Sequence, residues 1–72
     1  MKTMDDADKV IEQAFDKAVK ARRTADHPIS GYYSSARAKA QTIREAIRNG
    51  EWEPDALSFL KKRLEAAEYV GD

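Results

Sequence analysis

A helical period in the apolar residues is the feature that most limits how this chain can fold. Between positions 7 and 19, apolar residues recur at spacings of three and four: Ala7, Val10, Ile11, Ala14, Phe15, Ala18 and Val19. That spacing places them on one face of an α-helix. Thr3 precedes this stripe and Asp6 follows three positions on, as in a capping box, so we expect a first helix over residues 4–25.

Two further helices are expected after breaks in the pattern. Pro28 and Gly31 interrupt the periodicity, and a second helix over residues 35–49 is predicted by the stripe Ala36, Ala40, Ile43 and Ile47. Asn49 and Gly50 indicate its end, because both residues tolerate the left-handed conformation of a helix C-cap. Pro54 suits the first position of a third helix over 54–69, whose stripe is Leu57, Leu60, Leu64 and Ala67.

Size and composition make this one small all-α domain spanning residues 1–72. The chain has no cysteine, so neither a disulfide framework nor a thiolate metal site is expected. It also has no apolar run near the length of a membrane span and no signal-peptide core. We therefore expect a cytoplasmic three-helix protein without a membrane partner, with a thin core, as is usual for chains this short.

The expected helix lengths are unequal. A first helix over residues 4–25 would span about 33 Å, against about 20–23 Å for each of the others, at about 1.5 Å per residue. A three-helix bundle prefers matched lengths, so we expect part of the first helix to overhang. The overhang would either fray or pack on another chain, and a homodimer through the first helix is one such arrangement.

The charges balance overall but are unevenly distributed. The chain has 13 basic and 13 acidic residues, yet residues 17–48 carry eight basic and two acidic ones, and both flanking segments are acidic. Acidic residues early in a helix and basic residues late in it favour the helix dipole, which explains much of this gradient without any function. The alternative is a basic stripe on the second helix, formed by Arg37, Arg44 and Arg48.

That basic stripe carries the alternative prediction of nucleic-acid binding. Gln41 lies between the arginines, and Tyr32 and Tyr33 just upstream have rings that can stack on bases. The chain is neutral, however, whereas nucleic-acid-binding domains are usually clearly basic, and no recognised nucleic-acid motif is complete. Nucleic acid is therefore the less favoured partner.

Catalysis is not expected. His27 is the only imidazole and lies between Asp26 and Pro28 in a predicted loop, where no scaffold would hold a catalytic arrangement. Asp8, Glu12 and Asp16 lack the spacing of a calcium loop, and the three glycines form no phosphate-binding loop. We predict no enzyme activity, no catalytic residue, no metal site and no cofactor.

Apolar residues around the third helix suggest contact with another protein. Trp52 either caps the core where the second and third helices meet or anchors a partner, since Trp is frequent in interface hot spots. Phe59 widens the apolar stripe of the third helix, as in helices that dock into grooves. The candidate partner-binding residues are Trp52, Leu57, Phe59, Leu60 and Leu64.

One longer pattern runs through the second and third helices. An Ile-x-x-Ala-Ile segment, Ile43 to Ile47, ends at Asn49-Gly50, and Trp52 and Asp55 lie in the connection to the next amphipathic helix. Residues 35–67 thereby resemble the C-terminal region of the flagellar anti-sigma-28 factors, although Pro54 stands where that family has an aliphatic residue. The resemblance implies a bacterial or phage protein that sequesters a sigma factor, an RNA polymerase component, through this region.

Together these patterns predict a small non-catalytic regulatory protein. We expect it to bind another protein, as an inhibitor or adaptor of anti-sigma-like character. The third helix and Trp52 would form the contact, and the basic stripe of the second helix would edge it.

Overall fold

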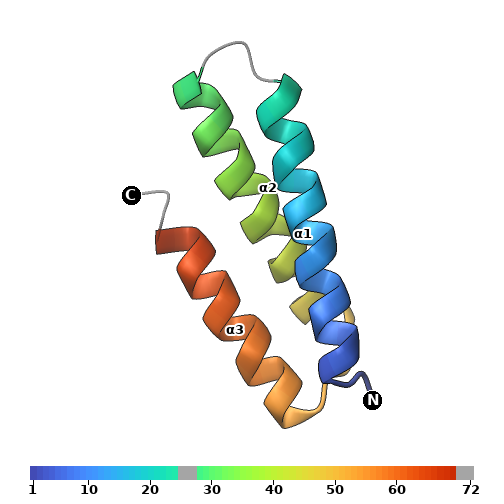
Figure 1. Cartoon of the computed structure of the whole chain (residues 1–72). Helices are drawn as coiled ribbons and strands as arrows, with labels where there is room; N and C mark the ends of the chain where they lie inside the picture. Colours follow the sequence, from blue (N-terminus) through green and yellow to red (C-terminus); the bar gives the residue numbers. More distant parts are fainter. Residues whose placement is uncertain (25–27, 70–72) are drawn as a thin grey trace.

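Three helices make up the part of the chain that the computed structural model describes, residues 1–24 and 28–69, with side chains for 1–24 and 34–68. They are α1 (Met4–Thr24), α2 (Pro28–Asn49) and α3 (Pro54–Tyr69). α1 and α2 form an antiparallel hairpin, and α3 returns along one side of it (Figure 1). The all-α class and the three-helix arrangement are confirmed, and the described residues form no strand.

The start of α2 differs from the prediction. It begins at Pro28, so the expected start at residue 35 was wrong. Pro28 occupies the first helical position, where its missing N–H costs no hydrogen bond and its fixed φ suits the helix. Gly31 lies inside the helix, where glycine costs only about 1 kcal/mol relative to alanine. The breakers read from the sequence therefore mark the beginning of a helix.

The starts of α1 and α3 follow the sequence signals closely. The backbone N–H of Thr3 donates to Asp6 Oδ2 at 2.9 Å, which is one half of the predicted capping box. This hydrogen bond lowers the pKa of the Asp6 carboxyl below its ordinary value, mainly because the charged carboxylate accepts from the Thr3 backbone. α3 begins at Pro54, as predicted. The predicted last residue of the first helix, Ala25, lies outside the described part.

The core lies at the end of the hairpin that α3 covers. Ile43 and Leu60 are its largest fully buried side chains. Small residues of α1 and α3 let the helices approach closely at this end, and half-buried side chains close its rim. The buried cluster consists of Ala7, Ile11, Ala14, Ile43, Trp52, Ala56 and Leu60, with Val10, Ala46, Ile47, Leu57, Phe59 and Leu64 packed against it.

Trp52 and Gly50 close the core between α2 and α3. Trp52 Nε1 donates to the carbonyl of Ala46 at 2.8 Å, which satisfies the indole and one carbonyl in the last turn of α2. A Cβ on Gly50 would lie 2.6 Å from Trp52 Nε1. No residue of the described chain has a positive φ, so the expected left-handed cap at Asn49-Gly50 was wrong. Gly50 is needed there for space.

The first residues of the chain pair with the α2–α3 connection. Lys2 N–H donates to the carbonyl of Glu51 at 2.8 Å, and Glu53 N–H donates to the carbonyl of Lys2 at 2.9 Å. These two hydrogen bonds form an isolated parallel bridge between Lys2 and Trp52. The Lys2 ammonium also lies 5.1 Å from the centre of the Trp52 ring, within the range of a cation–π contact. The N-terminal segment thus covers the joint between α2 and α3.

Candidate functional site

The predicted apolar contact residues are mostly committed to the core. Trp52 is 6% exposed and Leu60 is fully buried. Leu57, Phe59 and Leu64 are half-buried and pack against the same cluster. In this fold Trp52 and Leu60 offer a partner almost no surface, and the apolar width of α3 is explained by packing within the chain.

The predicted basic stripe is brought together on the exposed face of α2. Its arginines line a shallow hollow of about 400 Å³, whose lining residues are Arg37, Gln41, Arg44, Glu45 and Arg48. Arg44 Nη2 donates to Glu68 Oε1 of α3 at 2.6 Å, and both side chains are half exposed. Gln41 Nε2 donates to Glu45 Oε1 at 3.3 Å. The hollow therefore contains carboxylates as well as guanidinium groups.

A different apolar surface is open to solvent on α1. Ile11 is 9% exposed, but Phe15, one turn further along, is 51% exposed, and Val19, another turn on, is 46% exposed. Residues four apart lie on nearly the same strip of a helix. Burial along this strip therefore stops between Ile11 and Phe15.

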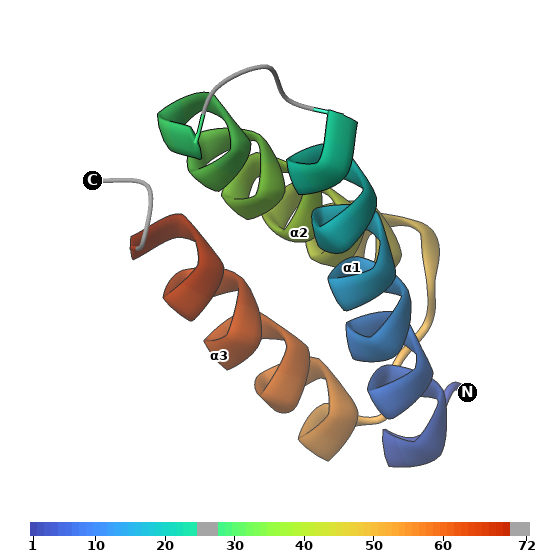
Figure 2. The ribbon, with the colours of Figure 1, turned by 45° about the horizontal axis from the view of Figure 1, so that its top comes forward.

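Burial stops between Ile11 and Phe15 because the third helix is short. α3 has 16 residues, against 21 in α1 and 22 in α2. Arg44, in the last two turns of α2, pairs with Glu68 near the end of α3, so α2 residues 28–40 extend beyond that end. Figure 2 shows the hairpin continuing past α3 without a third helix beside it. We call this part, residues 15–24 and 28–40, the outer hairpin.

The overhang predicted for the first helix is thus formed by α1 and α2 together, beyond the end of α3. The first helix was expected to exceed both other helices, which was wrong for α2 and correct for α3. Because α1 and α2 match in length, each supports the other over the outer hairpin. What overhangs is a pair of helices that lacks the third.

Lys39 lies where the open strip meets α2. Its ammonium is 4.3 Å from the centre of the Phe15 ring, and its side chain is only partly exposed. A lysine at this position, between Ala36 and Ile43 of the buried stripe, shows that the dry core ends here. The sequence placed Phe15 and Val19 on the same apolar stripe as the buried Ile11 and did not separate them from the core. Lys39 beside the stripe of the second helix was the signal that could have separated them.

Several other sequence features give no site. No group of three or more potential ligands among the described residues is placed to hold a metal ion, and this includes Asp8, Glu12 and Asp16. Asp26 and His27 lie outside the described part, as do the side chains of Tyr32 and Tyr33. None of the helices described combines the length and apolar composition that a membrane crossing requires.

Comparison with known proteins adds no assignment. No protein-family model matches the chain, and no curated protein or solved structure matches it either.

Proposed function

We propose that this chain is a small, non-catalytic cytoplasmic protein that acts by binding another protein, as an inhibitor or adaptor. The observation that carries the proposal is the open apolar strip on the outer hairpin, where Phe15 and Val19 continue the buried strip of Ile11 into solvent. Apolar side chains of this size, adjoining a core and left uncovered by the chain's own third helix, are typical of docking surfaces.

The proposed contact differs from that expected from the sequence alone. Trp52 and Leu60 act as scaffold, since they hold α3 against the hairpin. Phe15 and Val19 make the contact, and Lys39 lies at its edge. Leu57, Phe59 and Leu64 contribute only where their half-buried surfaces reach solvent.

A pull-down with a matched variant tests the proposal. The tagged chain and its Phe15→Ser/Val19→Ser double variant are each incubated with lysate of the native host cells after nuclease treatment. We expect a stoichiometric protein that the wild type retains and the double variant loses. Met4→Ser is the control, because Met4 is also an exposed apolar residue of α1, 39% exposed, at the other end of the helix. Equal recovery by all three proteins would contradict the proposal.

A sigma factor is the partner class implied by the resemblance of residues 35–67 to the flagellar anti-sigma-28 factors. Much of that segment is packed within the bundle, so a partner that contacts all of it must displace α3. Displacement would expose Trp52, the only tryptophan of the chain. Titration with purified sigma factors that lack tryptophan near the contact should then red-shift the emission of Trp52. Binding without a shift would favour the outer hairpin as the contact.

Nucleic-acid binding is the second candidate, supported by the hollow around Arg37, Arg44 and Arg48. The carboxylates of Glu45 and Glu68 in the same place weaken this alternative. A labelled oligonucleotide titrated at two salt concentrations provides the test. Binding that falls steeply with salt and is lost in Arg37→Gln/Arg48→Gln would support nucleic acid as the partner.

A further inference from the structure

We infer that the occupant of the outer hairpin is an acidic amphipathic helix of a partner protein, lying beside α1 and α2 beyond the end of α3. This inference rests on the proposed function and specifies the chemistry of the partner. It depends on the shape of the uncovered face, its charge, and the contact between Lys39 and Phe15.

The shape of the uncovered face of the outer hairpin favours a helix as its occupant. Beside residues 4–14 of α1, the hairpin is completed by α3, and over the outer hairpin the same pair of helices continues without a third (Figure 2). Phe15 and Val19 follow Ile11 at spacings of four, so the strip runs along the axis of α1. A partner helix of about three turns, roughly 15 Å long, matches the length from residue 15 to 24.

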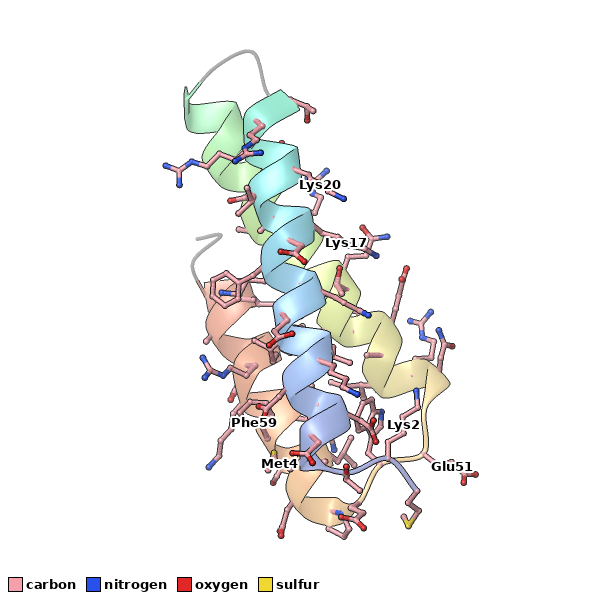
Figure 3. All side chains as sticks on the ribbon, turned by 45° about the vertical axis from the view of Figure 1, so that its right-hand side comes forward. Lys2, Met4, Lys17, Lys20, Glu51 and Phe59 are labelled. Carbon is pink, nitrogen blue, oxygen red and sulfur yellow. The ribbon has the colours of Figure 1, made fainter. Side chains whose placement is uncertain are left out.

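The positive charge of the outer hairpin favours an acidic partner. Its residues carry one acidic side chain, Asp16, and six basic ones, namely Lys17, Lys20, Arg22, Arg23, Arg37 and Lys39. Figure 3 shows Lys17 and Lys20 projecting from this part of α1 on the side away from α3, so they add to the charge of the outer hairpin without facing the open strip. Arg22 follows Val19 by three residues and therefore continues the apolar strip. A helix with carboxylates beside its apolar stripe complements this arrangement.

Lys39 fixes where one carboxylate must lie. Its ammonium covers one side of the Phe15 ring at 4.3 Å. A partner that buries Phe15 must also remove this ammonium from water, and an unpaired buried ammonium is costly. A glutamate or aspartate next to the partner's apolar residue would offset that cost. The same contact disfavours a wholly apolar occupant.

A second copy of this chain fits the face poorly. Two-fold pairing of the outer hairpin with itself would place its basic side chains against the same set in the other copy. The repulsion would be strongest at low salt. Self-association is therefore an outcome that the experiment must be able to detect.

The experiment uses the full chain and a fluorescein-labelled 14-residue peptide of Leu, Ala and Glu, with its leucines on one helical face. Fluorescence anisotropy should show binding at least tenfold tighter than that of a peptide of the same composition with its leucines spread around the helix. A peptide with Lys in place of Glu should not bind. The Phe15→Ser/Val19→Ser variant should lose tenfold or more in affinity, whereas Met4→Ser should change it less than twofold.

A second variant keeps the test valid if the double variant loses structure. Lys39→Gln should weaken binding of the Glu peptide several-fold. It should leave unchanged the affinity for a peptide of the same sequence with Gln in place of Glu. Equal binding of the ordered and scrambled peptides, or concentration-dependent dimerisation that buries Phe15, would overturn the inference. If the acidic peptide fails but the pull-down partner still depends on Phe15 and Val19, only the partner's chemistry is wrong. If both fail, the proposed function is wrong as well.

Discussion

Gly50 occupies a position where a single methyl group has no room. Its missing Cβ leaves the space that the Trp52 indole fills while Nε1 reaches the Ala46 carbonyl. Because φ at Gly50 is not positive, the backbone itself would accept an L-residue. The requirement for glycine comes entirely from packing.

Gly50→Ala should therefore destabilise the chain by about 1–3 kcal/mol, the usual cost of overpacking a filled site. The added Cβ, 2.6 Å from Nε1, would push the indole away from the Ala46 carbonyl. Urea denaturation followed by Trp52 emission measures the loss. Asn49→Ala, at an exposed neighbouring position, is the control and should change stability by less than about 0.5 kcal/mol. Equal stability of the two variants would contradict this account.

Asp6 makes the stability of the N-terminal end of α1 depend on pH. Since folding lowers the pKa of Asp6 below its ordinary value of 3.8, the ionised carboxylate favours the folded state. This contribution is present above the unfolded pKa and is lost as the pH falls through the folded one. Asp6→Asn should remove that part of the acid dependence. NMR titration of the Asp6 carboxyl measures the pKa directly, and Asp5→Asn, with the same change in charge, should leave the pKa of Asp6 low.

At the scale of the elements, α3 is held by its apolar face far more than by its ion pair. Leu60 is fully buried at the centre of the cluster, whereas Arg44 and Glu68 are half exposed. Half-exposed ion pairs usually contribute less than about 1 kcal/mol, because water and salt screen them. Burial of leucine contributes several times more.

Leu60→Ala should cost about 2–5 kcal/mol, which is comparable to the whole stability of about 3–5 kcal/mol expected for a core of this size. We expect a large unfolded fraction at 37 °C by circular dichroism. Leu57→Ala, at a half-buried position of the same helix, should cost less. A Leu60→Ala variant as stable as wild type would show that α3 is not part of the cooperative core.

Arg44→Glu should leave the fold intact and lower stability by about 1 kcal/mol or less. The small loss comes from placing two carboxylates, at positions 44 and 68, where an ion pair had been. The double variant Arg44→Glu/Glu68→Arg should restore most of it. Thermal melts of the wild type, the two single variants Arg44→Glu and Glu68→Arg, and the double variant measure the coupling. Unfolding by Arg44→Glu alone would mean that this contact is structural.

Three helices could be read from the sequence because each carries an apolar stripe with its own start signal. Thr3 with Asp6 and the proline at position 54 located two of the starts correctly. The start of α2 was missed because Pro28 and Gly31 suit both a loop and a helix entry, and only packing against α1 decides between them. Trp52 allowed two interpretations for the same reason. Its burial depends on Gly50 and Lys2, which local patterns do not bring together.

The candidate surface was harder to predict than the fold. Periodicity marks Ile11, Phe15 and Val19 as equivalent, and their exposures differ only because α3 ends where it does. The position of that end relative to α1 depends on tertiary arrangement, which spacing along the chain does not contain. The basic stripe was predicted correctly as a surface, because arginines at 37, 44 and 48 share a face of α2 whatever packs behind it.

At the scale of the whole molecule, order should decrease from the core towards the outer hairpin. The chain measures 40 × 21 × 16 Å, and its three-helix core fills only one end of the long axis. Amides of α1 from Ala7 to Ala14 should exchange slowly, and those after Phe15 faster, because local opening costs less where few apolar contacts are lost. Hydrogen exchange measured by NMR tests this gradient. Uniform protection along α1 in a monomer would contradict it.

The bridge between Lys2 and the α2–α3 connection also sets an order of events during synthesis. A nascent chain leaves the ribosome from its N-terminus, so α1 and α2 can pair before α3 exists. Lys2, although it emerges before all three helices, must wait for Glu51 and Glu53 before its backbone finds partners. Until then the growing chain is a hairpin with an open end. A segment that is made before all three helices is thus fixed in place only after two of them.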